Sequence, residues 1–173
     1  MSTLKVNTIQ EADGTAFPFI GMQDKWILTA NSNVNGEADI TSNWGRGSTQ
    51  NADTGNIGTG MTESSGVFTF PSTGIYLVMS RMVVQCNGGR TYIGMRQKFA
   101  TDGSNFGENV EGYTNGYMNT AYASVHITGV YDVTNTSTHK VRFACYTNRS
   151  SVVWRGSSAS SYSAFVFMKL GET

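Results

Sequence analysis

Apolar residues fall into short runs along the chain, most of them alternating with polar residues and closed by glycine, asparagine or serine. The run 122–131 alternates regularly, with Val125 and Ile127 on one face and His126 on the other. No window of about 11 residues keeps the i, i+3, i+4, i+7 spacing of an amphipathic helix. Many short strands separated by turn signals predict an all-β sandwich or barrel. We expect strands at 25–29, 67–70, 74–84, 91–99, 122–131, 141–146 and 161–170.

Two predicted strands carry more information than the others. Residues 74–84 are apolar on both faces, which predicts a strand in the interior between two layers. In 161–170, Phe165 and Phe167 lie opposite Val166 and Met168, so one face of that strand is aromatic. The polar, glycine-rich region 45–65 predicts either a long surface loop or an extended strand pair held by its neighbours.

The first 22 residues form a separate unit in the sequence. Two short apolar runs, 4–9 and 15–20, flank Asp13-Gly14, a dipeptide typical of hairpin turns. An isolated two-stranded ribbon is marginal in water, so this segment is expected to dock on its own domain, a symmetry mate or another protein. We therefore predict an attachment arm at 1–22 and a globular domain at 23–173. The candidate anchoring residues are Leu4, Val6, Ile9, Phe17, Phe19 and Ile20.

Composition narrows the classes of function. Only 14% of residues are charged, against about 25% in typical proteins, and twelve basic residues balance twelve acidic ones. The charge balance argues against nucleic acid as a partner. No apolar run approaches the roughly 20 residues of a membrane span, and the N-terminus lacks the pattern of a signal peptide. Folding in a reducing cytoplasm is expected, with Cys86 and Cys145 as buried thiols rather than a disulfide.

The reactive side chains predict no catalytic centre, metal site or cofactor. His126 and His139 show no triad spacing, and surface or interface histidines are the favoured interpretation. Glu108 and Glu111 flank a glycine-rich stretch that could hold calcium, but a solvated loop is favoured. Arg142, Arg149 and Arg155 could bind an acidic surface or a glycan, although strand or rim charges are the simpler interpretation.

An aromatic and polar segment near residue 115 is the candidate recognition loop. Tyrosine and asparagine suit recognition because they offer contact area with little entropy to lose. Packing in the core or at a trimer interface is the competing interpretation. The candidate residues are Tyr113, Asn115, Tyr117 and Asn119.

Residues 66–78, GVFTFPSTGIYLV, resemble the signature of the C1q/tumour-necrosis-factor superfamily. Pro71 is expected to end one strand, Gly74 to permit the reversal, and Tyr76 to start the inner strand. The segment 161–170 resembles that family's final strand, with Ala164 where glycine is usual. The resemblance implies a jelly-roll sandwich of about ten antiparallel strands that assembles as a tight homotrimer.

The opening ten residues, MSTLKVNTIQ, resemble the N-termini of structural proteins of tailed bacteriophages, particularly marine cyanobacterial phages. Together the two resemblances imply a non-enzymatic virion protein, assembled in the host cytoplasm and anchored to capsid, collar or tail. Its small size favours capsid decoration or a head fibre. A tail-fibre protein that binds a host-surface glycan is the alternative, and a soluble carbohydrate- or protein-binding module of a cell is a further one.

Overall fold

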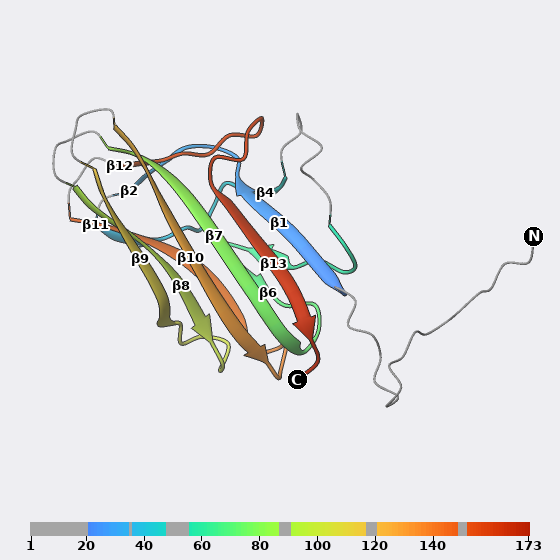
Figure 1. Ribbon diagram of the computed structural model, residues 1–173. Helices are drawn as coiled ribbons and strands as arrows, with labels where there is room; N and C mark the ends of the chain where they lie inside the picture. Colours follow the sequence, from blue (N-terminus) through green and yellow to red (C-terminus); the bar gives the residue numbers. More distant parts are fainter. Residues whose placement is uncertain (1–20, 35, 48–55, 87–90, 117–120, 149–151) are drawn as a thin grey trace, which may run out of the picture.

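A computed structural model describes residues 21–34, 36–47, 56–86, 91–116, 121–148 and 152–173. These residues form thirteen strands in two antiparallel sheets that pack face to face (Figure 1). The described part of the chain contains no helix that could cross a membrane. The thirteen strands in two packed sheets confirm the predicted all-β sandwich.

The sheet nearest the viewer in Figure 1, here called the front sheet, has seven strands. They are β1 (Met22–Leu28), β2 (Ser32–Val34), β4 (Trp44–Arg46), β7 (Gly74–Cys86), β10 (Ala121–Val133), β12 (Val152–Trp154) and β13 (Ala164–Gly171). The back sheet has six: β3 (Glu37–Asp39), β5 (Thr62–Ser64), β6 (Val67–Thr69), β8 (Thr91–Ala100), β9 (Gly107–Gly116) and β11 (Lys140–Thr147).

Strand β7 is the centre of the front sheet. It pairs with β10 over its whole length on one side, and on the other side with β13 and then β12. Neighbours in the sheets are thus mostly distant in sequence, as in a jelly roll, where the chain crosses repeatedly between two sheets.

The reversal predicted at 66–78 has the expected geometry. Strand β6 ends just before Phe70-Pro71, and β7 begins at Gly74, whose φ is 142°. Gly66 has a φ of 82°, and a Cβ there would lie 2.1 Å from the carbonyl oxygen of Ile40. Both glycines are needed because side chains rarely tolerate positive φ.

An aromatic cluster joins the two sheets. Phe68 and Phe143 of the back sheet meet Phe165 and Phe167 of β13, with 4.5 Å between the ring centroids of Phe143 and Phe165. Trp44 of β4 packs edge-on against Phe68 at 4.9 Å. The alternation in 161–170 therefore placed the aromatic face of that strand correctly in the core.

The structure corrects the placement of β7. Tyr76, Val78 and Met82 are buried in the sandwich, but Leu77 and Met79 point to the opposite side and stay partly exposed. Doubly apolar strands usually lie between layers, whereas here no described element covers the second face.

Several short strands gave no signal in the sequence because three residues are too few for a periodic pattern. In the region 45–65, the described residues include the end of β4, which pairs with β1, and all of β5, which pairs with β6. These two strands lie in different sheets, so the region is neither a simple loop nor a strand pair. The arm residues 1–20 lie outside the described residues. Met22 begins β1, the first described strand, and is only 3% exposed, so the chain already belongs to the core at this residue.

Candidate functional site: the outer face of the front sheet

The outer face of the front sheet presents the side chains that alternate with the core residues. In β10, Val125 and Ile127 point inward while Tyr122, His126 and Val130 are exposed, as the alternation predicted. The cross-strand register places Val130 opposite Leu77, and Met168 opposite Leu77 on the other side. Directly opposed residues contact one another in an antiparallel pair, so the outward side chains form continuous rows across three strands.

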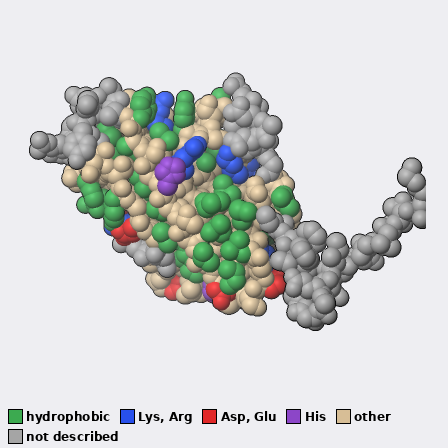
Figure 2. Space-filling model, viewed as in Figure 1, with side chains coloured by type: hydrophobic (Ala, Val, Ile, Leu, Met, Phe, Trp, Pro, Cys, Tyr) green, Lys and Arg blue, Asp and Glu red, His purple; other side chains and the backbone are tan. Residues whose placement is uncertain are grey.

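The rows at one end of this face form an apolar patch. Val130 is 61% exposed, and the other members are partly exposed. The patch consists of Ile75, Leu77 and Met79 of β7, Val130 of β10, and Val166 and Met168 of β13. Figure 2 shows these strands' apolar side chains gathered on the face toward the viewer. Large contiguous apolar patches on a protein surface mark interaction sites.

A cationic band follows the apolar patch along the same face. Arg81 lies directly opposite His126 in the β7–β10 pair, and Lys25 of β1 borders the same shallow hollow of about 390 Å³. Arg81 donates a hydrogen bond to the carbonyl oxygen of Ser161. Blue and purple side chains are visible above the apolar patch in Figure 2.

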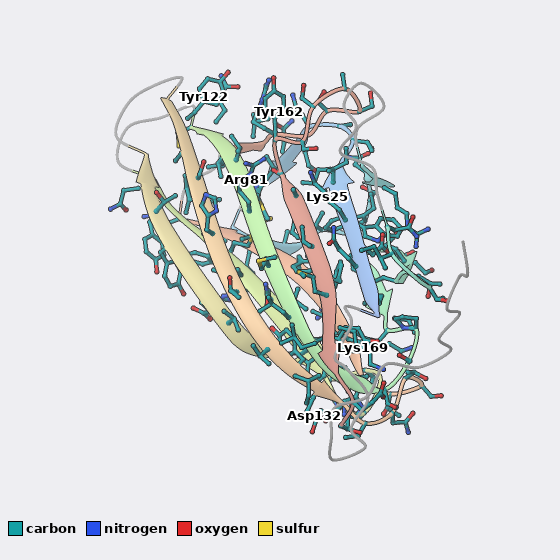
Figure 3. The ribbon with its side chains drawn as sticks, turned by 45° about the vertical axis from the view of Figure 1, so that its right-hand side comes forward. Lys25, Arg81, Tyr122, Asp132, Tyr162 and Lys169 are labelled. Atoms are coloured by element: carbon teal, nitrogen blue, oxygen red, sulfur yellow. The ribbon has the colours of Figure 1, made fainter. Side chains whose placement is uncertain are left out.

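A small aromatic pocket of about 250 Å³ lies beyond the cationic band. Its walls are Val83, Tyr122, Arg155 and Tyr162. The guanidinium carbon of Arg155 lies 5.8 Å from the centroid of the Tyr122 ring and 5.6 Å from that of Tyr162. Figure 3 shows Tyr122 and Tyr162 at the same end of the front sheet.

The outer face of the back sheet is different, because ion pairs cover it. Glu37 of β3 pairs with Arg96 at 2.8 Å and with Lys98 at 2.7 Å, and Asp39 pairs with Arg142 at 3.0 Å. The hydrogen bond from Lys98, reinforced by Arg96, lowers the pKa of Glu37 against the opposing effect of burial. Arg96, Lys98 and Arg142 thus have acidic partners. Arg81 and Arg155 have no carboxylate partner among the described residues.

The structure corrects the candidate recognition loop. Tyr113 and Asn115 lie within β9, where Tyr113 stacks on Tyr92 with 4.8 Å between ring centroids. Tyr117 and Asn119 lie outside the described residues, as do the six candidate anchoring residues of the arm. The first half of the predicted loop is therefore a strand, which the glycines of β9 concealed in the sequence and which β8 holds by pairing. A recognition role for Tyr113 and Asn115 stays a prediction.

The structure places the two histidines in different environments, and it does the same for two of the three arginines near the end of the chain. His126 is exposed, but His139 is only 9% exposed and packs edge-on against Phe99 at 5.5 Å, so it is not a surface residue. Arg142 stacks over Phe106 at 4.3 Å on the back sheet, whereas Arg155 belongs to the front-sheet pocket. Arg149 lies outside the described residues. Arg142 and Arg155 thus lie on opposite sheets and form no cluster with each other.

The described residues contain no group of three or more His, Cys, Asp or Glu side chains placed to hold a metal ion. Glu108 and Glu111 belong to β9, and Glu111 pairs with Arg96 at 3.1 Å. No site on the outer face of the front sheet was predicted from the sequence, although the second apolar face of 74–84 indicated one. No sequence pattern indicated the aromatic pocket, because its walls come from separate segments.

Comparisons with known proteins bear on the fold. No protein-family model and no curated protein matches the sequence. The structure of murine APRIL at pH 5.0 matches with a TM-score of 0.59 and 14% identity, covering 86% of this chain and 98% of that one. The structure of Eiger TNF from S. frugiperda matches with a TM-score of 0.57 and 11% identity, covering 91% and 96%. The chain therefore has the TNF-like jelly-roll fold that the motif at 66–78 implied.

Proposed function

We propose that this chain is a non-enzymatic structural protein of a phage virion, which forms a homotrimeric knob and is attached through its N-terminal arm. The apolar patch on the outer face of the front sheet is the observation that carries self-association. Fully burying one such side chain is worth roughly 1.5–3 kcal/mol. Six such side chains on one sheet face offer a second copy a contiguous apolar surface to bury.

The TNF-like fold and the resemblance at 66–78 support three copies rather than two. A threefold arrangement lets each copy present its patch next to that of its neighbour and leaves the ion-paired back sheet on the outside. Stable obligate interfaces are large and apolar, and of the two outer faces the front one meets that description.

Attachment to a virion is inferred from residues 1–10. Their likeness to phage structural proteins, with the six apolar residues of the arm, favours docking on a capsid, collar or tail protein. Capsid decoration or a head fibre remains the preferred role because a short arm is followed directly by the knob. A receptor-binding tail fibre is the second candidate, favoured by the pocket of Tyr122, Arg155 and Tyr162.

No catalytic role is part of the proposal. His126 is exposed and no described residue hydrogen-bonds its ring. A His126→Ala variant is therefore expected to assemble like the parent. A hydrolytic activity that this substitution abolished would overturn the non-enzymatic assignment.

Sedimentation of two matched variants tests the trimer. The full chain is expected to sediment as a trimer at micromolar concentration. Val130→Glu places a charge in the apolar patch and should give monomers. Thr62→Glu adds the same charge to an exposed position of β5 in the back sheet and should stay trimeric. A stable wild-type monomer, or dissociation in both variants alike, would contradict the proposed interface.

A further inference from the structure

The pocket of Val83, Tyr122, Arg155 and Tyr162 holds a positive charge that no described carboxylate neutralises. Among the described residues, Arg46, Arg96 and Arg142 each pair with a carboxylate. No described carboxylate pairs with Arg155. Its guanidinium has one polar contact, at 3.4 Å from Nη1 to Oε1 of Gln85, which is long for a hydrogen bond.

The backbone of Arg155 is nevertheless firmly placed. Its amide donates to the carbonyl oxygen of Val83 at 2.9 Å, and its own carbonyl accepts from the hydroxyl of Ser163 at 2.8 Å. Ser163 is fully buried and also accepts from the amide of Val83. The backbone of Arg155, which follows β12, is thus held against β7, while most of its guanidinium donors have no partner among the described residues.

Two tyrosine rings flank this charge. Tyr122 is 63% exposed and Tyr162 is 41% exposed, although both rings lie within 6 Å of the guanidinium carbon. Ring faces are electron-rich and attract both cations and polarised C–H groups. The pocket therefore combines a site for an anion with an apolar platform for a flat, C–H-bearing ring.

We propose that this pocket binds a carboxylate-bearing sugar residue, such as a uronic acid unit of an acidic polysaccharide. The carboxylate accepts two parallel hydrogen bonds from Arg155, the geometry in which arginine recognises planar oxyanions. The sugar ring packs against the exposed tyrosine faces, and the hydroxyls of Tyr122 and Tyr162 hydrogen-bond to its hydroxyl groups.

The dimensions favour a single sugar residue. The pocket is about 250 Å³, below the roughly 300–1,000 Å³ of pockets for drug-sized ligands. An inorganic anion would use Arg155 but leave the rings exposed, and a neutral sugar would leave the charge unpaired. The inference goes beyond the structural role proposed above. It requires that the trimer contacts, which we place at the apolar patch, leave the pocket open farther along the same face of β7.

Saturation-transfer NMR on the full chain tests the proposal with two sugars that differ only at C6. Methyl glucuronide is expected to bind, and methyl glucoside to bind at least tenfold more weakly. Arg155→Gln should weaken glucuronide binding at least tenfold, and Tyr122→Ala should also reduce it. Arg81→Gln removes a cation from the same face without flanking rings, so it should change binding less than twofold.

Three results would overturn the proposal. The first is equal binding of the two sugars, and the second is full binding by Arg155→Gln. The third is tighter binding of inorganic phosphate or of a short oligothymidylate than of the glucuronide. Sedimentation of each variant separates this test from that of the trimer: all three should match the parent, and dissociation of Arg155→Gln would instead place Arg155 in a subunit interface.

Discussion

Asp24 and Arg46 form an ion pair between a fully buried carboxylate and a half-exposed guanidinium, with 3.1 Å between Oδ1 and Nε. The other carboxylate oxygen of Asp24 accepts hydrogen bonds from Nε1 of Trp26 at 2.9 Å and from the amide of Met61 at 2.8 Å. Arg46 also stacks over the Trp26 ring at 4.8 Å. One carboxylate thus joins β1, β4 and the segment before β5.

Replacing Asp24 is therefore expected to destabilise the sandwich strongly. Asp24→Ala leaves the Trp26 and Met61 donors without their acceptor and removes the partner of Arg46, which should cost about 3 kcal/mol. Urea denaturation followed by tryptophan fluorescence measures the change. Ser124→Ala, at an exposed position of β10, is the control and should stay within about 0.5 kcal/mol of the parent. Equal stability of the two variants would show that the carboxylate contributes little.

A second buried polar group connects the two sheets. The side-chain amide of Gln97 in β8 donates to the carbonyl oxygen of Val78 at 3.0 Å and to the hydroxyl of Ser80 at 2.9 Å. Its oxygen accepts from the hydroxyl of Tyr131 at 2.8 Å. Tyr131→Phe keeps the ring but leaves that buried oxygen unpaired, so we expect a loss of about 1–3 kcal/mol. A thermal or urea unfolding curve unchanged by Tyr131→Phe would contradict this account.

The two buried cysteine thiols predict how the stability of the protein changes at alkaline pH. Cys86 and Cys145 are free and fully buried, and burial raises the pKa of each above its ordinary value of 9.0. The unfolded thiols ionise first as pH rises, so their contribution to the free energy of unfolding should be constant below about pH 8 and fall above pH 9. Neither thiol should react with Ellman's reagent at pH 8 until the protein is unfolded. Rapid modification of the native protein would contradict the buried placement.

Removal of the arm separates attachment from folding. Deleting residues 1–20 spares Met22, which belongs to the core, so the truncated protein should keep its unfolding midpoint and its trimeric sedimentation. Its incorporation into virions should be lost, as measured by its copy number in purified particles. Normal copy number after the deletion would refute the anchor, and loss of folding would show that the arm is part of the sandwich.

The sequence by itself determined the strands and their faces wherever a run was long enough to show its period. Val125 and Phe167 point inward because side chains alternate along any extended chain, and that alternation is local. The reversal at Gly74 was also expected, from the resemblance at 66–78, since positive φ at this position is a property of a few consecutive residues.

Tertiary structure alone decided which of those faces stayed open and which residues met on them. Tyr122 and Arg155 are more than thirty positions apart in the sequence, and only the registers of β10 and β12 against β7 bring their side chains together. The same holds for Asp24 and Arg46, which β1–β4 pairing unites. Periodic patterns encode the direction of each side chain but not the partner strand, because register depends on packing between distant segments.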